Sequence, residues 1–252
     1  MQKKNIIKLL KEKLTFGLEL EGVFNLDKIN ICEDDIADYH EGEDYDCYNF
    51  FKLEKDSSVY NINDSFQNYY CFEIISKPTT YADLNVYFEK LKAVLNITDS
   101  FYNSVRFNKT TGGHIHIKIN NNRFITNIYN LEFINLLNKN IFIFLDKYIY
   151  LFEEIKNNWF RSYAKKPTAQ NVGQDRGISV NKNNKYNTIE IRSLNFNGIK
   201  NIGTMYFLVS NILDIVINTI LEYNNLEDKQ PKKTKFNILT KKVKIENINI
   251  NC

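Results

Sequence analysis

Acidic, histidine and arginine side chains recur in this chain at alternate positions of short segments, a spacing that places each pair on one side of a β-strand. The residues concerned are Glu19, Glu21, Glu73, His114, His116, Glu190 and Arg192. Residues i and i+2 of a strand have Cα atoms about 7 Å apart, so such side chains leave the strand side by side. Gathered on one face of a sheet, these residues would form a metal- and phosphate-binding catalytic site.

The residue types indicate which ligands this site would bind. Two neighbouring carboxylates such as Glu19 and Glu21 repel each other unless a cation lies between them. Carboxylate oxygens suit Mg²⁺ or Mn²⁺, and the imidazole of His114 leans slightly toward Mn²⁺. Arg192 lies on the same side of its strand as Glu190, where it can bind a phosphate through two parallel N–H donors.

The elements that must position these residues are strands in which apolar and charged side chains alternate. Residues 15–24, 114–119 and 188–192 show this alternation, with aliphatic or aromatic side chains on one face and the charged ones on the other. Residues 70–76 and 177–181 are predicted as further strands, and residues 182–187 would close a hairpin. Gly17 and the Gly112-Gly113 pair precede charged positions and would let backbone or ligand approach closely.

Helices must cover the apolar side of these strands. Helical periodicity marks residues 81–97, 127–155 and 199–223. The sequence therefore predicts an α+β fold, a mainly antiparallel β-sheet with helices packed on one face and the active site on the other.

Composition limits the alternatives. With 252 residues, 43% of them hydrophobic, the chain suits a single catalytic domain over residues 1–224 followed by a basic tail over 225–252. A formal net charge of +3 favours neither a nucleic-acid nor a membrane partner. Four cysteines without a CxxC pair and the absence of a signal-peptide-like apolar run favour the cytoplasm, and the apolar window 205–221 is expected to be a core helix.

Five segments in order, FGLELE (16–21), DSS (56–58), FEIISKP (72–78), GGHIH (112–116) and TIEIR (188–192), resemble the amidoligase family. The resemblance covers about residues 15–196. It implies a glutamine-synthetase-like catalytic fold and a carboxylate–amine ligase that uses ATP and Mg²⁺ or Mn²⁺, with two ions expected. The family usually has Asp-Gly-Ser where this chain has Asp56-Ser57-Ser58, so a role for Asp56 is left open.

The resemblance also implies roles for individual residues. By analogy with glutamine synthetase, Glu19, His114 and Glu190 look like ligands of the metal that bridges the nucleotide phosphates, and Glu21 and Glu73 like ligands of the second ion, near the acyl phosphate. His116 and Arg192 would contact phosphate oxygens. Arg161 and Arg176 fall where such enzymes keep arginines that steady the nucleotide or the transferred group, so the implied catalytic residues are Glu73, Arg161, Arg176 and Arg192.

The implied partners are a carboxylate substrate and an amine substrate, including peptides or proteins, while the oligomeric state is left open. The acidic run 33–46 could bind the incoming ammonium, or it could be solvated surface. Two other function classes compete with the ligase. A metal-dependent nuclease or phosphoesterase would use similar acidic and histidine ligands, and a catalytically inert binding protein could share the fold.

Overall fold

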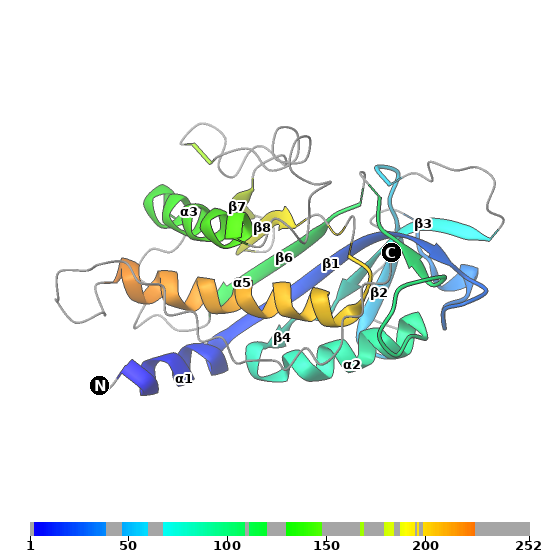
Figure 1. The fold of residues 1–252 in the computed structure, drawn as a ribbon, viewed down its shortest axis with the longest axis horizontal. Helices are drawn as coiled ribbons and strands as arrows, with labels where there is room; N and C mark the ends of the chain where they lie inside the picture. The colour runs from blue at the N-terminus through cyan, green and yellow to red at the C-terminus, as the bar shows by residue number, and fades with distance from the viewer. Residues whose placement is uncertain are drawn as a thin grey trace.

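The centre of the protein is an open, mainly antiparallel β-sheet (Figure 1). The computed structural model describes residues 3–38, 47–59, 68–108, 111–119, 130–147, 167–168, 179–183, 187–194, 196 and 199–224. The strands are β1 (Leu14–Asn25), β2 (Phe51–Lys55), β3 (Tyr69–Ser76), β4 (Thr79–Thr80), β5 (Val105–Arg106), β6 (Gly113–Ile119), β7 (Val180–Asn183) and β8 (Thr188–Leu194). They run in the order β2-β3-β1-β6-β8-β7, and the short β4 and β5 both pair with β1.

Four α-helices lie in the described part of the chain. They are α1 (Lys3–Lys13), α2 (Leu84–Leu95), α3 (Leu131–Lys147) and α5 (Ile202–Tyr223), with 3-10 turns η1 (Glu33–Asp35) and η2 (Tyr81–Asp83). In Figure 1, α5 lies across β1 and β6, with α1 and α2 beneath it. The prediction of a mixed α+β fold with a mainly antiparallel sheet is confirmed.

The hydrophobic core lies between the helices and the apolar face of the sheet. Leu18 of β1, Ile117 of β6 and Ile191 of β8 are fully buried there, together with Leu91 of α2 and Val216 of α5. The strand alternation thus turns every second side chain toward the helices. The intervening charged side chains emerge on the opposite face, called the polar face below.

The helix ends differ from the predicted ones for local reasons. α5 begins at Ile202 because the side chain of Asn201 accepts a hydrogen bond from the N–H of Thr204, an N-cap. α2 follows the 3-10 turn η2 and ends at Leu95, because the next residue, Asn96, has a left-handed conformation with φ 50°. α3 covers the described part of the predicted helix 127–155, since residues 127–129 and 148–155 lie outside the described residues.

Helix α5 is long and apolar enough to cross a bilayer by length and composition, and it is the one such helix among the described residues. Most of its most apolar window, 61%, is buried inside the protein. Met205, Ile212 and Val216 belong to the hydrophobic core, as expected of a core helix.

Several elements were not predicted. Residues 3–13 form α1, which buries Ile6 and Leu10, one helical turn apart. Strands β2, β4 and β5 are short, and two of them contain only two residues. β7 pairs with β8 as expected of a hairpin, but it continues to Asn183, which pairs with Thr188. The basic tail lies outside the described residues.

Gly113 serves the core rather than a ligand. A Cβ atom built on this glycine would lie 2.0 Å from a ring carbon of Phe196. Gly113 pairs with Leu20, so it faces the helices. A Cβ atom on Gly17, on the polar face, would instead make an ordinary contact, 3.6 Å from the backbone oxygen of Ser76.

Substituting Gly113→Ala is therefore expected to destabilise the protein by about 1–3 kcal/mol, because the methyl group overpacks the site filled by Phe196. Equilibrium unfolding in urea measures this loss. Gly17→Ala is the matched control and should change stability by less than about 0.5 kcal/mol. The double variant Gly113→Ala/Phe196→Leu should recover part of the loss, and equal losses in the two single variants would contradict the packing explanation.

Candidate functional site

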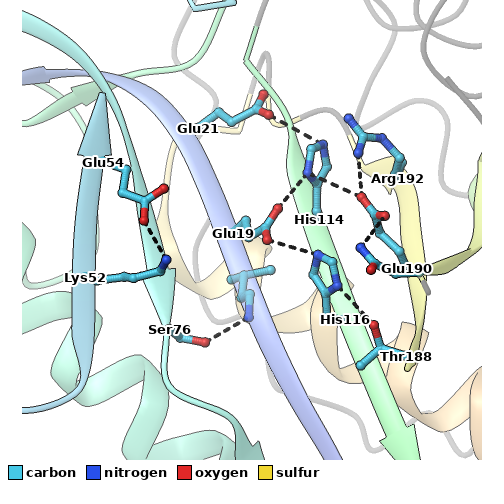
Figure 2. Close-up of polar contacts among 12 residues, drawn as sticks. Glu19, Glu21, Lys52, Glu54, Ser76, His114, His116, Thr188, Glu190 and Arg192 are labelled. Carbon is cyan, nitrogen blue, oxygen red and sulfur yellow. Dashed lines mark hydrogen bonds and ion pairs between the residues drawn. The ribbon is translucent and has the colours of Figure 1, made fainter. Parts of the chain in front are cut away.

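The register of β1 with its neighbours brings the predicted site residues together. Glu19 lies opposite His114 on β6, and Glu21 lies opposite Glu73 on β3. His116, one pleat along β6, lies opposite Glu190 on β8. Because directly opposite residues of an antiparallel pair share a face, all of these side chains emerge on the polar face. Figure 2 shows those of Glu19, Glu21, His114, His116 and Glu190.

His114 lies at the centre of these carboxylates. Its Nδ1 atom lies 3.0 Å from Oε2 of Glu19 and 3.8 Å from Oε1 of Glu190, and its Nε2 atom lies 3.5 Å from Oε1 of Glu21. Only 5% of His114 is exposed. One buried imidazole therefore contacts carboxylates from two strands, β1 and β8.

His116 has partners on β1 and β8. Its Nε2 atom lies 3.0 Å from Oε1 of Glu19, and its Nδ1 atom lies 3.2 Å from the hydroxyl oxygen of Thr188. The side chain of Asn183 donates a hydrogen bond to Glu190 at 3.3 Å. Thr188 of β8 therefore orients His116, and Asn183 of β7 orients Glu190.

Burial and neighbouring charges divide the carboxylates into two kinds. Burial alone would raise the pKa of Glu19, but the adjacent His116 and His114 outweigh it and hold that pKa well below its ordinary value. Glu190 has a lowered pKa for a similar reason, since His114 and Arg192 overcome the effect of its burial. Both side chains are therefore ionised at neutral pH.

Glu73 behaves in the opposite way. Burial, reinforced by Glu19, Asp56 and Glu21, raises its pKa to about 8. Burial and Asp56 likewise raise the pKa of Glu21, although His114 opposes them. At this end of the polar face, the negative charge of the carboxylates therefore exceeds the positive charge of the side chains around them. A bound cation would supply the missing positive charge and allow Glu73 to lose its proton.

His114 is charged at neutral pH in the free protein. Burial would lower its pKa, but Glu21 and Glu19 raise it to about 9. The imidazolium thus supplies positive charge where the carboxylates converge. A metal ion in the same place would displace this proton.

Among the residues that the structure describes, two sets of side chains have ligand atoms close enough to hold a metal ion. In each set the ligand atoms lie within 4.8 Å of one another. The first ligand group is Glu19, His116 and Glu190, and the second ligand group is Glu21, Asp56 and Glu73. Oxygen atoms with a single imidazole form a donor set that suits Mg²⁺ or Mn²⁺.

The structure adds one residue to each of the groups that the resemblance implied. His116 joins Glu19 and Glu190. Nδ1 of His114 also lies close to both of these carboxylates, so His114 stays a predicted ligand, and its Nε2 contacts Glu21 of the second group. Asp56, whose role the sequence left open, joins Glu21 and Glu73. It lies just after β2, and its carboxylate accepts a hydrogen bond from the N–H of Ser58 at 2.7 Å.

Arg192 lies beside the first ligand group because it follows Glu190 at the next alternate position of β8, close to a β-bulge. The register of β6 with β8 shifts between Gly113 and Ile115, so that β8 has an extra residue at this point. The guanidinium of Arg192 donates a hydrogen bond to Glu190 (Figure 2). Arg161 and Arg176 lie outside the described residues.

The acidic run 33–46 is described only up to residue 38. Residues 33–35 form the exposed turn η1, where the carboxylate of Glu33 accepts a hydrogen bond from the hydroxyl of Tyr70. Asp38 forms an ion pair with Lys55 at 2.6 Å, and both side chains are largely exposed. The described acidic side chains of this run therefore lie on the surface, whereas Ile36 between them belongs to the core.

One charged pair on the polar face was not predicted from the sequence. Lys52 and Glu54 are two residues apart on β2, and their side chains form an ion pair at 2.5 Å (Figure 2). Glu54 lies opposite Glu73 and is only 1% exposed. The alternation of Phe51 and Leu53 with these charges was the available signal, but it covers only five residues.

The fold and the site define a mixed α+β protein with acidic and histidine side chains clustered on one face of an open sheet. Residues 115–241 match the model of a family described as a domain of unknown function, DUF5080, and the chain belongs to this family. The match includes His116, Glu190 and Arg192, whereas β1 and β3 lie before it. No curated protein matches the chain.

The pair on β2 leads to a prediction about stability. Lys52→Met would leave the buried carboxylate of Glu54 without its ammonium partner and should destabilise the protein by roughly 3 kcal/mol in urea unfolding. The double variant Lys52→Met/Glu54→Leu should regain most of that loss. Lys55→Met, which breaks an exposed pair, is the matched control and should cost less than about 1 kcal/mol. A loss as large in the control would refute this explanation.

The shifted pKa values predict that the metal-free protein loses stability as pH rises from about 6 to 9. The folded protein holds the Glu73 proton up to about pH 8, against an ordinary pKa of 4.5, and the His114 proton up to about pH 9, against 6.5. A group whose pKa is raised by folding stabilises the protein below its unfolded pKa, and this contribution disappears as pH rises through the folded pKa.

Thermal unfolding in EDTA between pH 5 and pH 9 measures the trend. Glu73→Gln should flatten the decline, most clearly below about pH 8, because this variant has no proton to lose at that position. Glu89→Gln, on the exposed side of α2, should keep the wild-type slope. An unchanged slope in Glu73→Gln would show that Glu73 is not the titrating group.

Proposed function

We propose that this protein is an ATP-dependent carboxylate–amine ligase that forms an amide through an acyl phosphate, with a glutamine-synthetase-like catalytic fold. The observation that carries the proposal is the presence of two ligand groups on one sheet face, with His114 in contact with both and Arg192 at their edge. The order of the charged motifs along the chain, which resembles that of the amidoligase family, supports it.

The proposed reaction has two steps. An oxygen of the substrate carboxylate attacks the γ-phosphorus of ATP, the bond to the bridging oxygen breaks, and ADP leaves. A neutral amine then attacks the carbonyl carbon of the acyl phosphate, inorganic phosphate leaves with the bonding electrons, and the nitrogen loses a proton. Both steps require that phosphate charge be neutralised and that the reactants be held in line.

The residues of the polar face would have separate roles in this reaction. Glu19, His116 and Glu190 would hold the ion that binds the nucleotide phosphates, and Glu21, Asp56 and Glu73 would hold a second ion near the acyl phosphate. Bound Mg²⁺ or Mn²⁺ would supply charge neutralisation of the phosphate oxygens. Arg192 would bind the transferred phosphoryl group through its N–H donors. As the resemblance implies, Arg161 and Arg176 would steady the nucleotide or the transferred group.

A test needs no knowledge of the natural amine. Hydroxylamine attacks acyl phosphates and yields hydroxamates, so the purified chain with Mn²⁺, ATP and a panel of carboxylic acids should release ADP and form a hydroxamate. Glu190→Gln should abolish this reaction and weaken Mn²⁺ binding at least about tenfold, since it removes a ligand charge. Calorimetry measures the binding separately from the reaction.

Glu89→Gln is the matched control, because it makes the same substitution on an exposed helix surface, and it should bind Mn²⁺ as the wild type does. Cleavage of nucleic acid or phosphate esters without ATP would instead support a phosphoesterase. Absence of both metal and nucleotide binding would support an inert binding protein and would end the ligase proposal.

A further inference from the structure

Beyond the first ligand group, the polar face continues to a lysine. Lys118 follows His116 at the next alternate position of β6, so its side chain leaves the sheet on the polar face, one pleat or about 7 Å farther along the strand. It lies opposite Thr15 of β1, and its side chain is exposed. Lys118 belongs to neither ligand group, and the reaction described above gives it no role.

The described side chains that flank Lys118 on the polar face are neutral. On β1 the neighbour is Thr15, whose hydroxyl donates a hydrogen bond to the backbone oxygen of Lys118 at 3.2 Å. On β8 the neighbour is Thr188. Asp83 lies on the other side of β1, where its carboxylate accepts a hydrogen bond from Thr80 of β4. Lys118 is therefore a cation beside the acidic part of the face, with hydroxyl groups next to it.

Between Lys118 and the first ligand group, β1 has a glycine. Gly17 lies opposite His116, one pleat before Glu19, and has no side chain to occupy the polar face. A Cβ atom here would make only ordinary contacts with Ser76, at 3.6 Å and 3.8 Å, so packing does not require the glycine. On this strand, therefore, no side chain separates the carboxylate of Glu19 from the level of Lys118, and a ligand can approach the backbone.

Charge balance calls for a cation at this place if a nucleotide binds. The ionised carboxylates of the first ligand group, Glu19 and Glu190, already balance the charge of one divalent ion. Arg192 donates a hydrogen bond to Glu190, so part of its charge is used within the group. A nucleoside triphosphate brings several more negative charges, which a cation outside the ligand groups would stabilise.

The two ligand groups also give the nucleotide a direction. In the proposed reaction the γ-phosphate faces the acyl substrate, which lies toward the second ligand group. The first ion holds the β- and γ-phosphates, so the α-phosphate lies on the other side of this ion. Along β6 and β1, that side is the one occupied by Gly17 and Lys118.

We propose that Lys118 binds the α-phosphate of the nucleotide, and that the nucleoside lies beyond Lys118, at the end of the polar face away from the second ligand group. This inference rests on the proposed ligase function and specifies how its nucleotide is oriented. The acyl and amine substrates then approach from the end of the face that carries Glu21, Asp56 and Glu73. A lysine is a compact charge on a flexible stem, so its side chain can follow the phosphate when the nucleotide binds.

Calorimetry on the full chain with Mn²⁺ and a non-hydrolysable ATP analogue tests this orientation. Lys118→Gln should weaken binding of the analogue about tenfold, because one charged contact is lost, while Mn²⁺ binding and urea unfolding stay as in the wild type. Lys118→Arg keeps the charge and should bind the analogue nearly as the wild type does. Lys139→Gln is the matched control, because it makes the same substitution at an exposed position of α3.

Two inorganic probes identify the phosphate that Lys118 binds. Triphosphate and diphosphate differ by one phosphate, and only triphosphate would extend from the first ion to Lys118. Lys118→Gln should therefore weaken triphosphate about tenfold and leave diphosphate unchanged. In the hydroxamate assay, the same variant should raise the KM for ATP and leave kcat and the KM for the carboxylic acid unchanged, a pattern that a merely structural role would not produce.

The outcomes separate this inference from the proposed function. Unchanged binding of the ATP analogue in Lys118→Gln, or an equal loss for triphosphate and diphosphate, overturns the inference while the ligase proposal stands. Weaker binding of the carboxylic acid instead of the nucleotide would indicate the reverse orientation and overturns it too. Weaker nucleotide binding in a protein that forms no hydroxamate supports the orientation and counts against the ligase. Failure of the wild type to bind the ATP analogue overturns both.

Discussion

The pairing register of β1 is the constraint on which the site depends. This strand pairs with β3 along residues 19–25 and with β6 along residues 14–20, so it fixes the positions of both neighbours. A shift of one residue would turn Glu19 and Glu21 into the core and Leu20 toward the opposite face. The cost of burying those carboxylates excludes that register, and the same apolar packing that forms the core therefore positions the charged side chains.

The polar face illustrates how a protein tolerates several carboxylates in one buried place. Two of them, Glu19 and Glu190, are stabilised as anions by the histidines, with Arg192 also acting on Glu190. Glu73 is instead kept neutral by burial and by the carboxylates around it. The free protein thus balances its charges with protons, and these protons occupy the place that a divalent cation would take.

The sequence predicted the strands in which apolar and charged residues alternate over enough positions to be recognised. β1, β6 and β8 alternate apolar and charged residues, so their existence, their faces and their charged side chains could be predicted. β5 has only two residues and shows no period, so this strand could not be predicted from the sequence. The sequence also could not predict that His116 lies opposite Glu190. His114 and His116 share one face of β6, and only the pairing of β6 with β8 shows which of them lies opposite Glu190. Gly113 was expected to let backbone or a ligand approach closely, whereas the group that requires a glycine here is the ring of Phe196, which is distant in the sequence.

The position of His114 has a consequence for how two ions would bind. Its imidazolium contacts Glu19 of the first ligand group and Glu21 of the second, so it belongs electrostatically to both. An ion bound in either group would weaken the negative field that retains this proton, and the proton would be released once. A second ion would then bind to a group from which that positive charge had already gone. The shared imidazole would therefore link the two occupancies thermodynamically, and the loss of its proton would oppose the repulsion between the two cations.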